Sequence, residues 1–152
     1  MPGRGGLAHS KIGASAFGKA ALVHGSYAIL DNRTMADPKL FSIDTNTVPW
    51  EERPNEKIGR PLYRKNLMED PDTGMEVRLV RYPAGIINPK HTHPCAHGMF
   101  VLEGTLVTHD GKYGPGNFIW FPEGMVMEHG AAAESDAVVL FITNKRFEIH
   151  YQ

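Results

Sequence analysis

The sequence predicts an all-β protein, built as a sandwich or a small barrel, and three observations support this fold class. Sixteen glycines and eleven prolines among 152 residues are typical of many short strands that turns connect. From about residue 39, short apolar segments alternate with breaks that contain glycine or proline. In that region no segment of ten or more residues has the 3.6-residue apolar period of an amphipathic helix.

The first half of this region contains one clear strand and two weaker features. Residues 41–50 have short extended character that ends at Pro49, and residues 51–61 are expected to form a polar loop. Residues 75–82 (MEVRLVRY) are rich in β-branched and long apolar side chains, which favours a strand. Pro83 should end this strand, because proline has no N–H to donate to a neighbouring strand.

The second half contains three strand candidates. Residues 99–109 predict a strand that bends at Gly104, and the Asp-Gly pair at 110–111 is typical of a hairpin turn. Residues 117–121 and 137–144 are apolar and predict two further strands. Strands at such short intervals are those of a sandwich or barrel rather than of an α/β protein.

Composition and charge exclude several classes of partner. Sixteen Lys and Arg against seventeen Asp and Glu give a net charge of −1, which offers no electrostatic footprint for nucleic acid. The longest apolar run, 137–142, is far shorter than the roughly 20 residues of a membrane helix, so we expect a soluble protein without a membrane partner. The single cysteine, Cys95, cannot close an intrachain disulfide, which fits a cytoplasmic location.

Residues 1–38 are expected to be a poorly structured N-terminal extension, and residues 39–152 a single domain. Residues 1–30 contain basic but no acidic side chains, and the composition changes after them. A cleaved targeting peptide is the alternative, but Lys19 and His24 interrupt its apolar stretch.

Five of the eight histidines lie between residues 91 and 129 and suggest a metal site. In a strand the side chains of His91 and His93 point to the same face. His97 could reach the same ion if the chain kinks near Pro94, and an adjacent strand could deliver His129 from across a barrel. Burying three imidazoles without a metal or other partners would leave polar atoms uncompensated. The remaining four are expected to be surface or hydrogen-bonded residues: His9, His24, His109 and His150.

Residues 85–124 also contain two regular motifs. The first runs glycine, five residues, His-x-His, three residues, histidine, six residues and glycine, and the second runs glycine, five residues and Pro-x-Gly. The first motif comprises Gly85, His91, His93, His97 and Gly104. The second comprises Gly116, Pro122 and Gly124, followed by Met127 and His129.

These motifs resemble those of the cupin superfamily, over roughly residues 75–143. Cupins usually have glutamate where His97 stands and histidine where Met127 stands. The resemblance implies a single-domain cupin fold, a double-stranded β-helix or jelly-roll barrel, over residues 39–152. It does not by itself imply one reaction, because this fold carries many functions.

The site without a carboxylate is similar to that of the small monodomain cupins with all-histidine ligands, which include acetylacetone dioxygenase-like enzymes. This resemblance implies an oxidoreductase: a non-haem iron dioxygenase that cleaves a C–C bond of a small diketone or enolisable carbonyl substrate. It implies one divalent ion per chain, held by His91, His93, His97 and His129, with Fe(II) favoured and Mn, Ni, Cu or Zn as alternatives. It also implies a homodimer.

Several alternatives stay open at this point. The same metal could act as a Lewis acid in a lyase or isomerase without O2, or the protein could bind a metal or small molecule without catalysis. Met127 could replace His129 as a ligand, which would point toward copper. Cys95 could be a thiolate ligand or nucleophile rather than a packing residue, and Glu128 could support the site from outside the ligand set.

Overall fold

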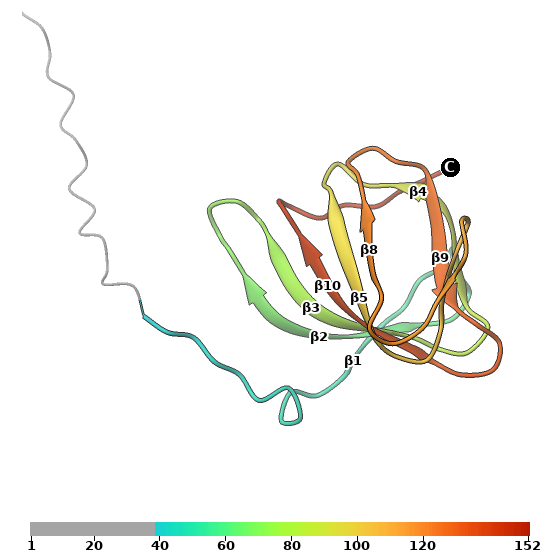
Figure 1. The fold of residues 1–152 in the computed structure, drawn as a ribbon. Helices are drawn as coiled ribbons and strands as arrows, with labels where there is room; N and C mark the ends of the chain where they lie inside the picture. Colours follow the sequence, from blue (N-terminus) through green and yellow to red (C-terminus); the bar gives the residue numbers. More distant parts are fainter. Residues whose placement is uncertain (1–38) are drawn as a thin grey trace, which may run out of the picture. The chain divides into compact units, whose positions relative to one another are not determined.

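The computed structural model describes residues 39–152, and residues 40–152 form one compact unit. The expected N-terminal extension, 1–38, lies outside the described residues, as do His9 and His24. Within residues 39–152 the regular secondary structure consists of eleven strands, and no helix occurs (Figure 1). The all-β prediction is therefore confirmed. For the same part of the chain, no helix has the length and hydropathy that a membrane crossing requires.

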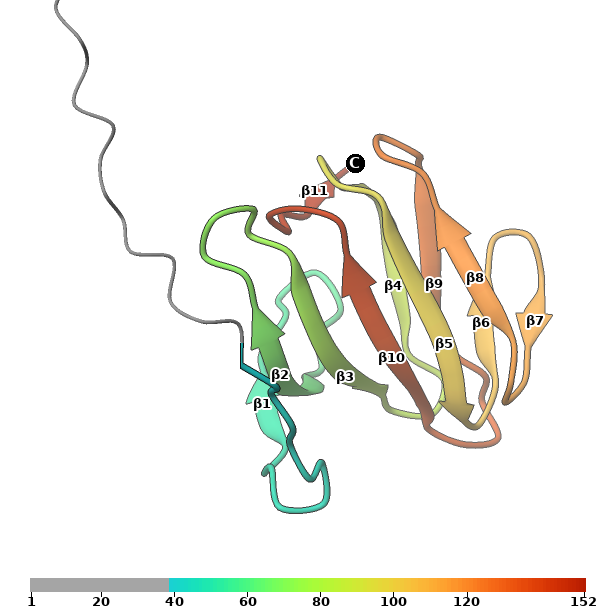
Figure 2. The same ribbon diagram turned by 60° about the vertical axis from the view of Figure 1, so that its left-hand side comes forward.

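The strands form two antiparallel sheets that face one another (Figures 1 and 2). The six-stranded sheet has the order β1 (Glu51–Arg53), β2 (Leu62–Glu69), β3 (Glu76–Tyr82), β10 (Ala137–Thr143), β5 (His97–Glu103) and β8 (Phe118–Phe121). The five-stranded sheet has the order β11 (His150–Tyr151), β4 (Ile87–Thr92), β9 (Met127–Ala131), β6 (Leu106–Thr108) and β7 (Lys112–Tyr113).

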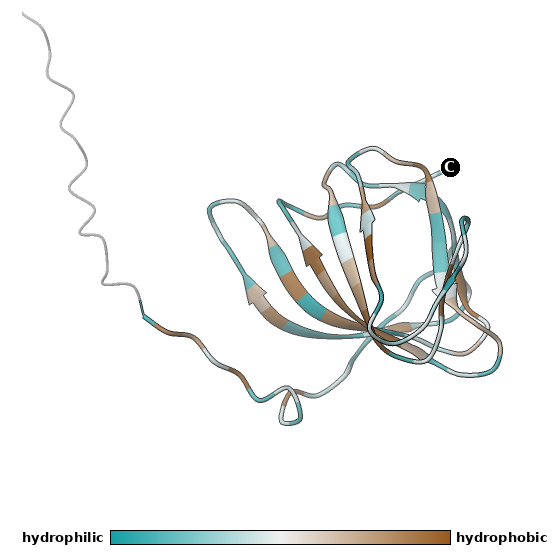
Figure 3. Cartoon of the chain, viewed as in Figure 1, coloured by the Kyte–Doolittle hydropathy of each residue, from teal (hydrophilic) through white to brown (hydrophobic). Residues whose placement is uncertain are grey.

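The hydrophobic core lies between the two sheets. It combines β3, β5, β8 and β10 of the larger sheet with β6 and β9 of the smaller one. Along β3, the buried Arg78, Val80 and Tyr82 alternate with less buried neighbours, because successive side chains of a strand point to opposite faces. Figure 3 shows hydrophilic and hydrophobic bands along β3, which do not follow burial strictly, because the buried Arg78 is hydrophilic.

Most expected strands are present, with one difference at Gly104. Residues 99–109 do not form one bent strand but two strands, β5 and β6, which belong to different sheets. Gly104 has a φ of +68°, and a Cβ there would lie 1.9 Å from the carbonyl oxygen of Asp136. Glycine is therefore required where the chain leaves one sheet for the other. The predicted hairpin turn at 110–111 connects the paired strands β6 and β7.

Four regions differ from the prediction. Residues 41–50 contain a turn and no strand, and part of the expected polar loop forms β1. The strands β2 and β11 were not predicted from the sequence. All three residues of β1 are exposed, and β2 lacks apolar alternation. The positions of these two strands therefore depend on backbone pairing with a neighbouring strand and not on a pattern of side chains.

Candidate metal centre

Four histidines enter the interior between the two sheets. His91 lies on β4 and His129 on the adjacent β9, while His93 follows the end of β4 and His97 begins β5. Their side chains are almost inaccessible, with exposures of 0% for His91 and His97, 2% for His93 and 3% for His129. The four residues singled out by their spacing are therefore all buried, as the sequence predicted.

A β-bulge in β4 places His91 on the interior face. Asn88 pairs with His129 and His91 pairs with Met127, and the register shifts between these two pairs. Residues three apart on a regular strand point to opposite faces, yet Asn88 and His91 are both buried. The bulge lies around Pro89, which has no N–H for strand pairing.

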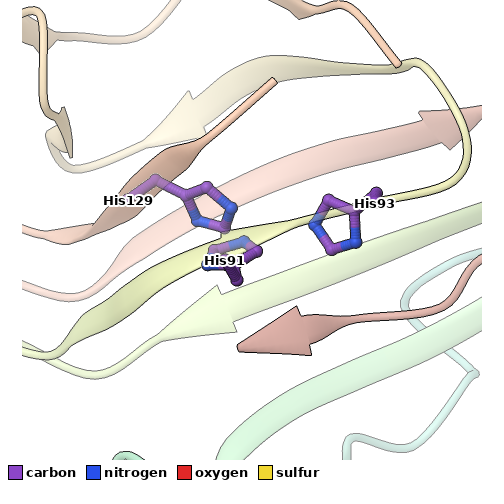
Figure 4. Close-up of side chains that lie close together, drawn as sticks. All are labelled: His91, His93 and His129. Carbon is purple, nitrogen blue, oxygen red and sulfur yellow. The ribbon is translucent and has the colours of Figure 1, made fainter. Parts of the chain in front are cut away.

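Three of the imidazoles form a group that could hold one metal ion (Figure 4). One ring nitrogen from each of His91, His93 and His129 lies within 4.8 Å of the others. The ring of His91 is 4.8 Å from that of His93 and 4.9 Å from that of His129, measured between centroids. At this spacing, the three nitrogens could serve as ligands of one ion.

Backbone carbonyls fix the orientation of two of these rings. Nδ1 of His91 donates to the carbonyl oxygen of Pro89, and Nδ1 of His93 donates to that of Glu148, each over 2.5 Å. Because a carbonyl only accepts, the proton is on Nδ1 and the lone pair is on Nε2. This is the arrangement by which proteins orient metal-binding histidines.

Several ring nitrogens in the site have no hydrogen-bond partner. They are Nε2 of His91 and both ring nitrogens of His97 and His129. Burying a polar atom without a partner costs free energy, and a metal ion at the centre of the cluster would remove part of that cost. The described residues therefore fit a divalent metal.

The electrostatics of the site favour neutral imidazoles. Burial, reinforced by neighbouring histidines and by Arg78, lowers the pKa of His93 to about 4 and that of His97 to about 3. Burial also lowers the pKa of His91, and that of His129 falls well below its usual value. Neutral imidazole is the form that binds metals, so the ligands are available at pH 7 without competition from protons.

His97 lies beside the three-histidine group rather than within it. Its ring stacks on Phe121 at 4.8 Å and on Phe141 at 4.9 Å. It lies 4.8 Å from the ring of His93 but 6.4 Å from that of His129. The role of His97 as a fourth ligand stays a prediction.

The other candidate side chains have different surroundings. Met127 is 1% exposed and belongs to the hydrophobic core, while Glu128 is only partly buried. Cys95 is fully buried, and burial raises the pKa of its thiol. A raised pKa disfavours the thiolate, which is the form that acts as nucleophile or metal ligand, so the packing role is favoured for Cys95.

A cavity of ≈ 310 Å³ lies next to the cluster, between the two sheets. His93 and His129 line it together with Tyr82, whose ring meets that of His129 edge-on at 5.6 Å. In the same sheet as His129, the Tyr151 hydroxyl on β11 donates to Oδ1 of Asn88 on β4 over 2.9 Å, and both residues line the cavity. This volume lies within the range of small-molecule sites.

Several residues of this cavity were not predicted, although one signal for them is present in the sequence. Arg78 shares strand parity with the buried Val80 and Tyr82, and this parity indicates a charged side chain that faces the interior, although it was not used for a prediction. No comparable signal identified Tyr151 or the Glu148 carbonyl, because a strand of two residues carries no periodic pattern.

Comparison with known proteins supports the fold. No curated protein matches the sequence significantly. Among solved structures, a candidate acetylacetone dioxygenase from Methylibium petroleiphilum has a TM-score of 0.60 at 14% identity, covering 70% of this chain and 78% of that protein. The polyketide cyclase RemF from Streptomyces resistomycificus has a TM-score of 0.57 at 19% identity, over 74% and 85% of the two chains.

A third similar structure is that of Rhodobacter sphaeroides SigE in complex with the anti-sigma ChrR, with a TM-score of 0.54 and 20% identity over 66% of this chain and 52% of that chain. At these identities the likeness concerns the fold, which is that of cupins. The model of the ChrR cupin-like domain matches residues 38–148, well over half of the sequence. The chain therefore belongs to the ChrR cupin-like family.

Proposed function

We propose that this protein is a metal-dependent cupin enzyme, a dioxygenase that cleaves a C–C bond of a small diketone or other enolisable carbonyl compound. The observation that carries the proposal is the group formed by His91, His93 and His129, which is buried, free of carboxylates and adjacent to a cavity. The similarity in fold to a candidate acetylacetone dioxygenase supports the reaction class.

In this proposal His91, His93 and His129 hold one metal ion, with His97 as a fourth ligand. Fe(II), the favoured metal, would supply Lewis acidity toward an enolate and redox chemistry toward O2. The backbone carbonyls of Pro89 and Glu148 keep two ligand rings in the orientation that presents Nε2. The ligand set leaves the 2+ charge uncompensated, which favours a bound anion such as an enolate.

The cavity would orient the substrate and exclude water. Phe141 and Phe147 provide apolar walls, which lower the local dielectric and strengthen attraction between the site and an anion. Burial raises the pKa of the Tyr82 phenol, so Tyr82 stays protonated and can donate a hydrogen bond to a substrate oxygen.

The first experiment is elemental analysis of protein purified without added metal, combined with oxygen-consumption assays on small diketones. We expect about one metal ion per chain and oxygen uptake with at least one diketone. The variant His91→Ala should lose both the metal and the turnover, whereas His109→Ala, which changes an exposed histidine, should keep both. Normal activity in metal-free protein would overturn the proposal.

Two other functions compete with the dioxygenase. The fold similarity to a polyketide cyclase favours a metal-dependent lyase, isomerase or related enzyme that needs no O2, and conversion of a carbonyl compound under anaerobic conditions would identify it. The family, described after ChrR, favours a non-catalytic metal or small-molecule binder. That protein would change its stability with ligand while forming no product.

A further inference from the structure

Positive side chains surround the part of the cavity formed by β1, β2 and β3. Arg53, Arg64 and Arg78 line the cavity, and Glu76 is the only acidic residue among its lining residues. Arg64 pairs with Val80 and Arg78 pairs with Asn66 on the facing strands, so the two arginines are diagonal neighbours on the same face of the sheet. Like charges at this spacing repel each other, so the placement of both arginines here suggests that the cavity binds a negative charge.

Arg78 is held rigidly inside the protein. Its side chain is almost completely buried, and Nη1 donates to Oε2 of Glu76 over 2.5 Å. The guanidinium carbon lies 4.6 Å from the ring centroid of Phe141 and 4.4 Å from that of Phe147. Nε of Arg78, however, is buried without a hydrogen-bond partner. A buried guanidinium donor without an acceptor is unusual, because its burial costs more than that of a neutral group.

The same two aromatic rings connect Arg78 to the histidines. Phe147 packs on the ring of His93 at 4.5 Å, and Phe141 stacks on the ring of His97 at 4.9 Å. The guanidinium is therefore one aromatic side chain away from the candidate metal centre, and both border the same cavity. A single small molecule in the cavity could contact both.

The charges in this region do not cancel. Arg53 and Arg64 approach one carboxylate, that of Glu51, at 2.7 and 3.7 Å, and Arg78 is paired with Glu76. Three cations thus face two carboxylates, before the charge of a metal is added. Nε of Arg64, like that of Arg78, is buried and makes no hydrogen bond. Excess positive charge and two unused donors are what a bound carboxylate requires.

We propose that the substrate carries a carboxylate in addition to its enolisable carbonyl group. The carboxylate lies against Arg64 and Arg78, and the carbonyl end lies at the histidine cluster. This assignment rests on the proposed function for the carbonyl end, but the arginine end stands on its own contacts. The substrate class is accordingly a small keto acid, such as a 1,3-diketone extended by a carboxylate, rather than a neutral diketone.

Two probes that differ in the carboxylate test the inference: 2,4-pentanedione, which lacks it, and 2,4-dioxopentanoate, which has it. Their binding to the full chain is measured by calorimetry without O2, on both metal-loaded and metal-free protein. We expect the carboxylate-bearing probe to bind at least about tenfold more tightly, as one charge-assisted hydrogen bond suffices for that ratio. Equal binding of the two probes to the parent protein would overturn the inference.

Arginine variants locate the effect. Arg78→Gln and Arg64→Gln should each reduce the preference for dioxopentanoate by about tenfold while changing the binding of pentanedione little. Arg81→Gln is the matched control, because Arg81 lies on β3 like Arg78 but does not line the cavity. Since Arg78→Gln removes a buried ion pair and could prevent folding, Arg64→Gln, at a less buried site, keeps the test decisive. A preference unchanged in both folded variants, or in a folded Arg64→Gln alone, would refute the inference.

The outcome separates this inference from the proposed function. Preferential binding of dioxopentanoate that depends on the arginines, without oxygen uptake, would support the carboxylate site and refute the dioxygenase. Oxygen uptake with both probes at equal efficiency and equal affinity would support the dioxygenase and refute the carboxylate site.

Discussion

At the scale of single residues, His91 and His93 use their two ring nitrogens differently, since Nδ1 of each donates to a backbone carbonyl. In His93, Nδ1 is occupied by the Glu148 carbonyl, which leaves the lone pair of Nε2 for a metal. Burial keeps this ring neutral, since it lowers the pKa to about 4. The same buried rings should make the stability of the metal-free protein depend on pH.

The stability of the metal-free protein should fall between pH 6.5 and about 4. In this window the unfolded chain protonates His93 and His97, whose pKa values there are about 6.5, while the folded protein holds them neutral. The unfolded state therefore binds more protons, and the free energy of unfolding decreases as the pH is lowered. Urea midpoints at several pH values measure this slope.

The control for this prediction uses two asparagine variants. His93→Asn removes one of the proton-binding groups and should make the slope shallower. His109→Asn changes an exposed histidine, leaves the buried imidazoles in place and should keep the slope of the parent. A pH-independent midpoint in the parent would contradict the interpretation.

At the scale of elements, the junction between β5 and β6 allows a sharp test. Gly104→Ala should destabilise the protein by more than about 1 kcal/mol, because its positive φ and its contact with the Asp136 carbonyl both exclude a Cβ. Gly124 has a similar φ of +74° but no atom within 4 Å of a Cβ. Gly124→Ala therefore isolates the backbone strain, and chemical denaturation should show the smaller loss there. Equal losses would mean that the contact with Asp136 contributes nothing.

The outer face of the larger sheet is where we expect the predicted homodimer to form. Five apolar side chains on β5, β8 and β10 are between 36% and 57% exposed there, and β8 is the last strand of its sheet: Phe100, Leu102, Phe118, Trp120 and Ile142. An exposed apolar sheet face with an open edge strand favours association. Sedimentation should show twice the chain mass of 16.8 kDa.

The variant Trp120→Glu should shift this association toward the monomer. Val126→Glu is the control, because Val126 is exposed to a similar extent, at 45% against 51%, but lies outside these three strands. A monomeric parent protein at micromolar concentration would contradict the prediction.

The strands differ in how well their positions can be predicted from the sequence. Strands with strong apolar patterns, such as β3 and β10, could be located because burial of one face determines their register. The weakly patterned β1, β2 and β11 could not, because their positions depend on pairing partners distant in the sequence. The histidine spacing identified the buried cluster, whereas no pattern in the sequence predicted the part of the cavity wall that β2 and β11 form.

At the scale of the whole molecule, a metal should stabilise the fold. A ligand that binds only the folded state raises the free energy of unfolding in proportion to the logarithm of its concentration relative to Kd. Adding Fe(II) or Zn(II) to metal-free protein should therefore raise Tm by several degrees in calorimetry. His91→Ala should abolish this shift, while His150→Ala, at an exposed site, should retain it. An equal shift in His91→Ala would place the bound metal elsewhere.

The hydrogen bond between His93 and the Glu148 carbonyl has a consequence for biosynthesis. The chain is made from its N-terminus, so all four histidines are translated before residue 148. Until that residue emerges and docks, the ring of His93 lacks the partner that holds Nε2 toward the cluster. The nascent chain therefore has the four buried histidines before it has their final geometry, and we expect the site to bind a metal with full affinity only after residue 148 has docked.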